Sequence, residues 1–204
     1  MNLEAPSTDE QLHELSMRGD ASAFEDVYDR RQAGIYRFAL RMTGSVTMAE
    51  DITQDVFLSY LRDGKQFDAT RGSVKSYLYG IARHRTLRCL DRERSISNLT
   101  TVIDDNDSDF EQLLPHTDPF SDLEREQVVQ VVRQAILSLP AHFREVIVLC
   151  HLQEMNYAEA AEIIECPIGT VRSRLNRART LLLEKLESLN PAIAAKQLTQ
   201  EQGL

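Results

Sequence analysis

The stretch NYAEAAEIIECPIGTVRSRLNRARTLLLEKL, residues 156–186, decides the fold of this 204-residue chain. Asn156 followed three residues later by Glu159 is a capping-box pattern, which predicts a short helix ending at residue 164. The segment 165–167 ends in proline and breaks that helix, after which apolar residues recur at helical spacing over 167–186. The stretch therefore predicts two helices joined by a tight turn.

The spacing of small and apolar residues in this stretch is typical of a helix-turn-helix. Ala161 is small enough for two helices to cross, Glu165 takes the turn position, and Val171 is a branched residue that locks the second helix. The apolar residues of the second helix share one face: Val171, Leu175, Ala178 and Leu182. The residues left on the outside are Arg172, Ser173, Asn176, Arg177 and Arg179. Arginine pairs with guanine or phosphate and asparagine suits adenine, so this face favours DNA binding over its alternative, a helical hairpin with a solvated basic face.

The rest of the chain also shows helical periodicity. Apolar residues predict a helix over 23–42 that ends at Gly44. Thr47 and Glu50 form a capping-box pattern that predicts the start of a second helix, running to about residue 62. Ser73 is positioned to cap a third helix, and further helices are expected over 123–139 and 141–152. Eight glycines, six prolines and 6% aromatic residues argue against a many-stranded sandwich or barrel.

Residues 95–120 lack this periodicity and predict a flexible linker. The segment 104–126 carries a net charge of −8, whereas 71–94 carries +5 and 172–185 carries +4, within a total of −9. We therefore expect an all-α protein of two small helical domains joined by a flexible acidic linker, the second domain a helix-turn-helix. The expected divisions are an acidic N-terminal extension (1–20), a first domain (21–94), the linker (95–120), a second domain (121–189) and a tail (190–204).

Several classes of protein are disfavoured by the sequence. The longest apolar run, 146–150, is far shorter than a membrane span, and the polar N-terminus shows no secretory signal, so a soluble cytoplasmic chain without membrane insertion is expected. Three cysteines fit a reducing compartment without disulfides. No phosphate loop, nucleophile elbow or metal motif occurs, and Cys150-His151 has no second ligand pair. We expect no enzyme activity, no cofactor, no metal and no small-molecule substrate.

A polar stripe lies along the predicted second helix. Asp51, Gln54, Asp55 and Leu58 follow one another at helical spacing, while Ile52, Val56 and Tyr60 face the other way. An acidic patch with an exposed leucine is a plausible protein-docking surface, since charge steers the encounter and the leucine adds burial. The alternative is an ordinary solvated face.

The third predicted helix carries two cations around an aromatic ring. Lys75, Tyr79 and Arg83 recur every four residues, which suits single-stranded DNA because bases stack on rings while cations follow phosphates. The alternative is that Tyr79 and the nearby His84 are half-buried helix residues.

Both parts of the chain resemble the extracytoplasmic-function (ECF) sigma factors, the smallest sigma subunits of bacterial RNA polymerase. In the C-terminal part the resemblance rests on Leu139-Pro140, Arg144-Glu145-Val146, GTVRSRL at 169–175 and Arg177-Ala178-Arg179. It implies that the upstream (minus-35) promoter element is contacted by Thr170, Arg172, Ser173, Asn176, Arg177 and Arg179. The family commonly has glycine where this chain has Glu165, so a left-handed turn there would carry some strain.

The N-terminal resemblance covers EDITQDVFL at 50–58 and VKSYLYGIARH at 74–84. It implies that Asp51, Gln54, Asp55 and Leu58 bind core RNA polymerase. It also implies a set of residues that read the downstream (minus-10) element, including a loop that captures a flipped base. That set is Phe67, Asp68, Arg71, Lys75, Tyr79, Arg83 and His84. Tyr77 stands where the family usually has tryptophan, and His84 where asparagine is common.

The resemblance implies an alternative sigma factor that binds core polymerase and directs promoter recognition, DNA melting and transcription initiation, with an anti-sigma factor as a further partner. The two domains must separate to read two elements along one duplex, and core polymerase is expected to hold them apart. In the free protein the acidic linker is expected to screen the two basic helices. Two alternatives remain open: a helix-turn-helix regulator that acts without polymerase, and a sigma-like adaptor that binds only proteins.

Overall fold

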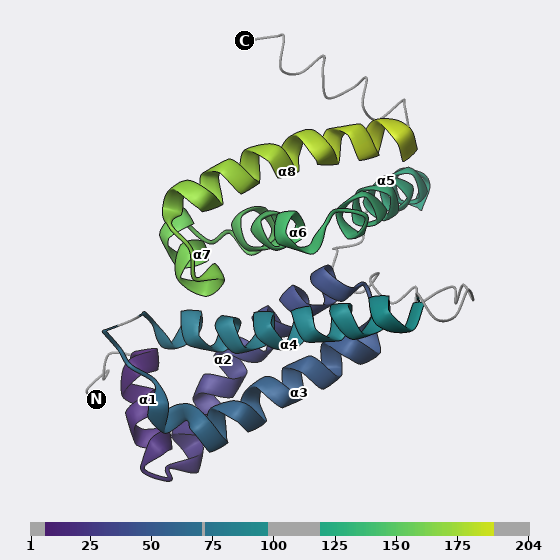
Figure 1. Cartoon of the computed structure of the whole chain (residues 1–204). Coiled ribbons are helices and arrows are strands. Elements are labelled where there is room, and N and C mark those ends of the chain that lie inside the picture. The colour runs from purple at the N-terminus through teal and green to yellow at the C-terminus, as the bar shows by residue number, and fades with distance from the viewer. Residues whose placement is uncertain (1–6, 71, 98–118, 190–204) are drawn as a thin grey trace.

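The computed structural model describes residues 7–70, 72–97 and 119–189, which form helices joined by short turns. The N-terminal half holds α1 (Asp9–Met17), α2 (Ala21–Thr43), α3 (Val46–Asp63), the 3₁₀ turn η1 (Gly64–Gln66) and α4 (Val74–Ser97). The C-terminal half holds α5 (Pro119–Leu137), α6 (Ala141–Ile147), the π-helical segment η3 (Val148–Leu152), α7 (Tyr157–Ile164) and α8 (Ile168–Leu189). Figure 1 shows the two halves as two layers, with α4 and α7 at the boundary between them. The all-α prediction of two helical units is confirmed.

Local sequence signals account for most helix ends in the N-terminal half. Gly44 closes α2 in the left-handed conformation, with φ 77°, where glycine is favoured. Ser73 starts α4, since its hydroxyl accepts the backbone N–H of Ser76 at 3.1 Å. The expected start of α3 at Thr47 is wrong: Ser45 is the cap, and its hydroxyl accepts the backbone N–H of Met48. Once Gly44 has turned the chain, Ser45 is the first residue in an extended conformation, so the helix begins there.

The helix α1 is an element that the sequence reading did not predict. Thr8 and Gln11 form a capping box at its start. Asp9 is buried and pairs with Arg30 and Arg31 of α2. His13 is also buried, and its Nδ1 lies 3.0 Å from the hydroxyl of Tyr60 on α3. These contacts fix α1 onto α2 and α3.

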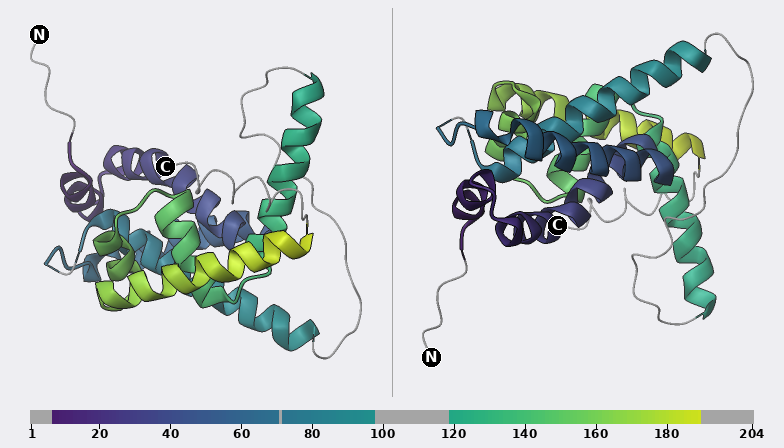
Figure 2. Two further views of the ribbon diagram at one scale, coloured as in Figure 1. Left: turned by 90° about the horizontal axis from the view of Figure 1, so that it is seen from above. Right: turned by 90° about the horizontal axis from the view of Figure 1, so that it is seen from below.

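The C-terminal half contains the predicted helix-turn-helix. Asn156 caps α7 and Glu159 completes the capping box, as expected. Ala161 of α7 and Val171 of α8 are both buried in the hydrophobic core. The helix predicted over 141–152 begins as α6 and passes into the π-helical η3. Figure 2 shows α5 projecting from the body of the molecule at its N-terminal end.

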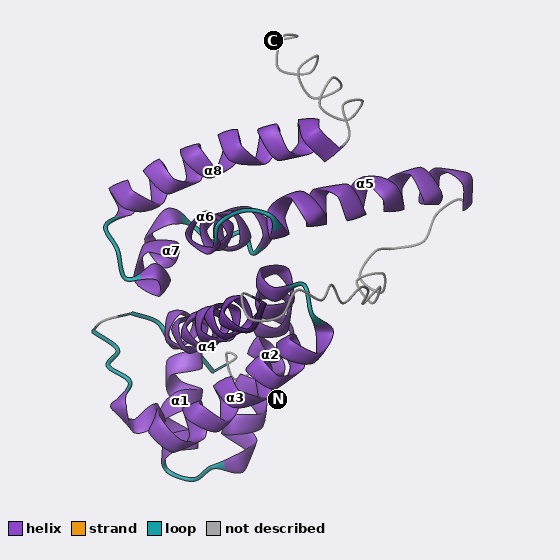
Figure 3. Ribbon diagram, turned by 45° about the vertical axis from the view of Figure 1, so that its right-hand side comes forward, coloured by secondary structure: helices purple, strands orange, loops and turns teal. Residues whose placement is uncertain are grey.

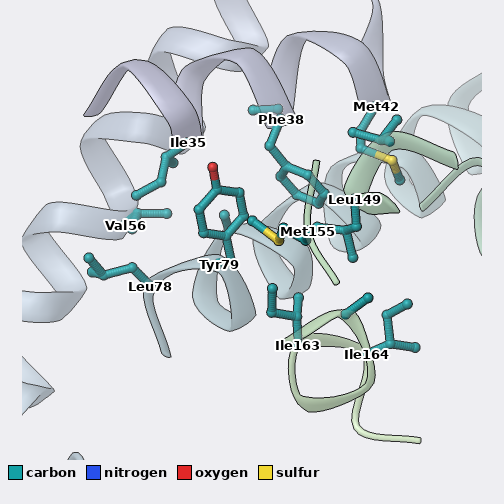
Figure 4. Packing of buried hydrophobic residues seen from close by; sticks show 14 of the residues in the cluster. Ile35, Phe38, Met42, Val56, Leu78, Tyr79, Leu149, Met155, Ile163 and Ile164 are labelled. Carbon is teal, nitrogen blue, oxygen red and sulfur yellow. The ribbon is translucent and has the colours of Figure 1, made fainter. Parts of the chain in front are cut away.

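One hydrophobic core joins the two halves. In Figure 4 the labelled residues Phe38, Met42 and Tyr79 of the N-terminal half lie against Leu149 and Met155 of the C-terminal half. All five are at most 4% exposed to solvent. The halves therefore pack as one body here, and Figure 3 shows the same apposition from another side.

The backbone at the end of α2 adds polar contacts to this shared core. The buried guanidinium of Arg144 on α6 donates to the carbonyls of Met42, Leu137 and Leu139. Burial, with the charge of Arg94, lowers the pKa of Arg144 to about 10, so the group stays charged at neutral pH. Arg133 of α5 donates to the carbonyl of Gly44 at 2.8 Å. The last turn of α2 is thus capped by the other half of the chain.

The boundaries of the expected linker differ from those of the helices. α4 continues through Ser97 and α5 starts at Pro119, so both ends of the expected linker 95–120 are helical. The remainder of that linker, with the short turn expected near 110–114, lies outside the described residues, as do Arg71 and the tail 190–204.

Candidate functional site

The expected polymerase-docking stripe is an exposed ridge of α3. Asp51, Gln54, Asp55 and Leu58 are all exposed, and Leu58 keeps 55% of its surface accessible. Ile52, Val56 and Tyr60 are buried on the opposite face, as predicted. Asp55 also lies 3.4 Å from a guanidinium nitrogen of Arg85 on α4.

Leu61 extends this ridge and was missed by the sequence reading. It is 50% exposed and lies three residues after Leu58, so the same helical spacing would have found it. Two exposed leucines beside two carboxylates suit a protein partner that offers basic groups around an apolar contact.

The expected minus-35 face lies on α8. Arg172, Ser173, Asn176, Arg177 and Arg179 are exposed, and Thr170 is half-buried at the start of the helix. Val171, Leu175 and Ala178 are buried beneath them, and Leu182 is partly buried. The structure therefore brings the predicted residues together on one solvent-facing surface, in the helix that a helix-turn-helix inserts into the major groove.

Two of the arginines on this face are held by neighbouring aromatic side chains. The guanidinium of Arg172 lies over the ring of Tyr157 on α7, 5.8 Å from its centroid. The Nε of Arg179 donates to Nε2 of His151 at 3.2 Å. Burial and the positive charge of Arg179 lower the pKa of His151, which keeps the ring neutral and able to accept. Of the pair Cys150-His151, the histidine thus contacts an arginine of this face.

The turn between α7 and α8 has the left-handed geometry expected from its sequence position. Glu165 has φ 56° and ψ 49°, and its backbone N–H donates to the carbonyl of Glu162 at 3.2 Å. A non-glycine residue in this conformation costs roughly 1–2 kcal/mol. Ala161 before the turn and Val171 after it are both buried in the hydrophobic core, which holds the turn in place despite that cost.

The expected minus-10 helix is covered rather than open. Lys75 Nζ lies 2.8 Å from Glu159 Oε1 of α7, and Arg83 Nε lies 2.7 Å from Glu145 Oε2 of α6. Between them, Ser76 donates from its hydroxyl to Glu162 Oε2 at 2.8 Å. The side of α4 that carries Lys75 and Arg83 therefore faces the C-terminal half, while His84 is exposed.

In this arrangement Tyr79 does not present its ring on an open face, and it is instead a buried helix residue. The residue is 4% exposed, and its ring packs edge-on to Phe38 at 5.7 Å between centroids. Its hydroxyl donates to Gln153 Oε1 at 3.3 Å, and Gln153 Nε2 in turn donates to the carbonyl of Gly34. Tyr79 is buried because α2 lies beneath it and the segment that follows η3 lies over it.

The expected base-capturing loop is organised by its own side chains. Asp68 is exposed, and its Oδ1 accepts both the backbone N–H and the hydroxyl of Thr70, at 2.9 and 2.7 Å. Phe67 is half-buried between His13 and Tyr77, with ring centroids 4.8 and 5.4 Å away. In this loop Phe67 is thus an anchor, and Asp68 stands at the surface.

The carboxylates that face α4 were also missed by the sequence reading. Glu145 is 1% exposed and pairs with both Arg83 and Arg174, the latter at 3.2 Å. Burial would raise the pKa of Glu159, but hydrogen bonds from Lys75 and the Asn156 backbone, with the charges of Lys75 and Arg31, lower it overall. Only the capping pattern of Glu159 was visible in the sequence, because the α4 partners of these carboxylates (Lys75, Ser76 and Arg83) lie 62–86 residues away along the chain.

The described residues contain no group of three or more histidine, cysteine, aspartate or glutamate side chains placed to hold a metal ion. Nor does any helix in that part of the chain have both the length and the apolar character needed to cross a bilayer.

Two family models match the chain, one in each half. Residues 27–96 match Sigma-70 region 2, and residues 130–182 match Sigma-70, region 4. The first match includes the ridge of α3 and the covered face of α4, and the second includes the helix-turn-helix.

Curated relatives are similar over most of their length. The ECF RNA polymerase sigma factor SigW of Bacillus subtilis is 32% identical over 179 residues, covering 84% of this chain and 93% of its own. The ECF RNA polymerase sigma-E factor of Escherichia coli is 31% identical over 187 residues, covering 89% and 96%. The ECF RNA polymerase sigma factor SigC of Mycobacterium tuberculosis is 31% identical over 192 residues, covering 89% and 94%.

Two solved structures share this fold. RpoE of Bartonella quintana, crystallised with the anti-sigma factor NepR, aligns with a TM-score of 0.65 at 24% identity, over 82% of this chain and 98% of its own. CnrH, solved with the cytosolic domain of CnrY, has the same TM-score at 22% identity, over 89% and 99%. At these identities the likeness establishes the fold.

Proposed function

The chain belongs to the extracytoplasmic-function sigma factors of RNA polymerase, and from this membership we propose how its surfaces divide the work of transcription initiation. The ridge of α3 binds core polymerase, the exposed face of α8 reads the minus-35 element, and the 67–70 loop with α4 engages the minus-10 element. The working compartment is the cytoplasm, and the protein confers promoter choice on the polymerase without catalysing a reaction of its own.

The observation that carries this proposal is the α3 ridge. Leu58 and Leu61 are both at least half exposed in a helix whose other face is buried, and Asp51 and Asp55 flank them. Exposed leucine side chains are stabilised when a partner buries them. The carboxylates around them attract a basic partner and set its orientation. A polymerase-independent DNA-binding regulator has no use for such a ridge.

The face of α8 supports the upstream contact. Four exposed residues, Arg172, Ser173, Asn176 and Arg177, lie in the first half of the helix that enters the major groove. Their side chains can pair with both bases and phosphates.

On α4, Lys75 and Arg83 are the residues proposed to follow the backbone of the melted strand. Asp68 and His84 are exposed and are proposed to meet bases, and Arg71 is included with them from the family resemblance. Phe67 and Tyr79 are proposed to act in the same region once their present packing changes. These contacts require α4 to be freed from the C-terminal half.

An anti-sigma factor is part of the same proposal as a further partner. The fold recurs in RpoE and CnrH, which were solved with NepR and CnrY respectively. Purification of the tagged chain from its own cells, followed by mass spectrometry, tests this partner directly.

The function is tested by transcription from a library of randomised promoters with purified, sigma-free core polymerase. We expect the chain to associate with the core enzyme and to produce transcripts whose start sites share two upstream sequence elements. The Leu58→Asp variant should strongly reduce both signals. Transcripts that do not depend on the added chain, or a chain that never associates with core polymerase, would overturn the proposal.

A further inference from the structure

The connection between α3 and α4, which carries the 67–70 loop, is held at both ends by α1. Figure 1 shows α1 at the same end of the molecule as this connection. Residues 68–70 are exposed, whereas Gly64 before the loop and Val74 after it are buried. The loop is thus a short exposed segment between two buried points, and α1 contacts both of them.

The first contact lies where the loop begins. The ring of His13 meets the ring of Phe67 edge-on, with the centroids 4.8 Å apart. His13 is itself held in place, because its Nδ1 lies 3.0 Å from the hydroxyl of Tyr60 on α3. Beside this ring pair, a Cβ at Gly64 would lie 2.9 Å from the sulfur of Met17. Side chains of α1 therefore pack directly against the start of the loop.

The second contact is a carboxylate at the start of α4. Glu10 Oε1 accepts the backbone N–H of Val74 at 3.4 Å. Val74 is the first residue of α4, so this N–H has no acceptor within the helix, and a negative charge at that end is favourable to the helix dipole. Glu10 therefore fixes where α4 begins relative to the loop.

The helix α1 has its own anchor on α2. Asp9, the neighbour of Glu10, is buried and pairs with Arg30 at 3.3 Å and with Arg31. The two adjacent carboxylates thus have different partners, since Asp9 holds α1 on α2 while Glu10 reaches α4. All of these contacts lie within the N-terminal half, so they do not depend on how the two halves pack.

Resting on the function proposed above, we propose that Glu10 and His13 are positioning residues for minus-10 recognition. Through Val74 and Phe67 they fix the conformation in which the 67–70 loop receives a base of the melted strand. Neither side chain contacts the base itself. A loop whose conformation is set beforehand loses less conformational entropy when it binds, so the base is held more tightly.

The variants separate positioning from a general effect on stability. Glu10→Ala removes the acceptor at the start of α4, whereas Glu10→Gln retains a side-chain oxygen that accepts the same N–H. The matched control is Glu14→Ala, which removes an exposed glutamate of the same helix. His13→Ala removes the ring that meets the loop. Asp68→Ala, in the loop itself, is the reference for a lost loop contact.

The positioning contacts are measured first in the free chain, without polymerase. NMR-detected amide exchange at Phe67, Thr70 and Val74 reports on the loop and its ends, because each of these N–H groups is hydrogen-bonded. We expect faster exchange in Glu10→Ala than in Glu14→Ala, by about five- to tenfold, the size expected for one lost hydrogen bond. Equal exchange rates in the two variants would overturn the proposal.

Base capture is measured with core polymerase and a promoter selected from the randomised library. The minus-10 element of this promoter carries 2-aminopurine, a base whose fluorescence rises when it is unstacked. We expect Glu10→Ala and His13→Ala to slow the fluorescence rise about five- to tenfold, while Glu10→Gln stays within about twofold of the wild type. Association with core polymerase should change less than about twofold in every variant, a split that a loss of fold does not produce.

A failure of loop positioning is distinguishable from a failure of the sigma function. If Asp68→Ala slows the rise while Glu10→Ala and His13→Ala behave like Glu14→Ala, α1 does not position the loop. If Glu10→Gln is as slow as Glu10→Ala, the acceptor at the start of α4 has no such role. A wild-type chain that gives no rise would overturn the proposed function and loop positioning with it.

The result does not depend on the stability of one variant. If circular dichroism shows that His13→Ala is unfolded, the comparison of Glu10→Ala with Glu10→Gln and Glu14→Ala decides. Glu10 is only partly buried and does not belong to the hydrophobic core, so its replacement leaves that core intact.

Discussion

Glu145 of α6 accepts a hydrogen bond at 2.7 Å from Arg83 of α4, a residue 62 positions earlier in the chain. The other oxygen of the same carboxylate accepts from Arg174 of α8 at 3.2 Å. One buried carboxylate therefore connects the helix proposed to hold the melted strand with the helix proposed to read the duplex.

The Glu145–Arg83 pair should contribute measurably to stability. In a double-mutant cycle with Glu145→Gln and Arg83→Gln, we expect a coupling free energy of about 1–3 kcal/mol by chemical denaturation, because the pair is largely shielded from water. The same cycle with Arg88→Gln, an exposed residue of α4, serves as the control. Additive effects of the first two substitutions would show that the pair is not formed.

Leu58 should matter for polymerase binding and not for folding. Because 55% of its surface is exposed, Leu58→Asp should change the free energy of unfolding by less than about 0.5 kcal/mol. It should weaken binding to core polymerase at least about tenfold, as expected for the apolar centre of an interface. The control is Leu15→Asp on α1, which is 41% exposed and lies outside the ridge. Equal binding by the two variants would contradict the assignment.

The hydroxyl of Tyr79 leaves no room for a side chain at position 34, which is occupied by glycine. A Cβ at position 34 would lie 2.6 Å from that oxygen and 3.7 Å from the ring carbon that bears it. We therefore expect Gly34→Ala to destabilise the wild type. In a Tyr79→Phe background the same substitution should instead stabilise by roughly 0.5–1 kcal/mol, the usual gain of alanine over glycine in a helix. Thermal and denaturant unfolding of the four proteins measures this reversal of sign, and the same sign in both backgrounds would refute the contact.

His13 should make the stability of the N-terminal half sensitive to pH. Burial lowers the pKa of His13, against the opposing influence of Glu14 and Glu10. The unfolded chain then binds this proton more readily than the folded one, so stability is full above the unfolded pKa of about 6.5 and falls as the pH drops through it.

The measurement is the free energy of unfolding between about pH 7.5 and about pH 5.5. His13→Gln should give a flatter profile than the wild type, whereas His142→Gln, at an exposed position, provides the control. NMR titration of the His13 ring checks the cause, and a ring that titrates at or above its ordinary pKa would contradict the prediction.

Tyr157 should position Arg172 for promoter reading. The ring beneath the guanidinium restricts its orientation, and such cation–π contacts at exposed sites are worth about 0.5–1 kcal/mol. Tyr157→Ala should therefore reduce transcription from a promoter selected by this protein about two- to fivefold, while Tyr157→Phe should retain it. Equal activities of the alanine and phenylalanine variants would remove this role.

The elements that could be predicted from sequence are those fixed by local chemistry. Three helix ends are set by the local backbone: the left-handed C-terminal caps Gly44 and Glu165, and the N-terminal cap Asn156. The stripe 51–58 could be read because helical spacing alone decides which side chains share a face. The helix α1 could have been predicted in the same way, since Thr8 and Gln11 carry a capping box.

The covered face of α4 could not be predicted in this way. Helical spacing indicates correctly that one face of α4 carries Lys75, Tyr79 and Arg83. It does not indicate which residues from the rest of the chain contact that face. Their partners Glu159, Gln153 and Glu145 lie in another segment, and only the packing of the two halves brings them together. The expected screening by linker acids lies outside the described residues, and the carboxylates observed on α4 belong to α6 and α7.

Separation of the two halves during promoter engagement would open the core that they share. Separation of the halves exposes Leu149 and Met155, which are at most 3% accessible in the packed chain, so an opened molecule offers water fresh apolar surface. Opened molecules without an enzyme to hold them would be prone to self-association. In a cell that holds more of this protein than free polymerase, most copies would then remain in the packed state. Substitutions in the shared core would change how readily the protein competes with other sigma subunits for the polymerase.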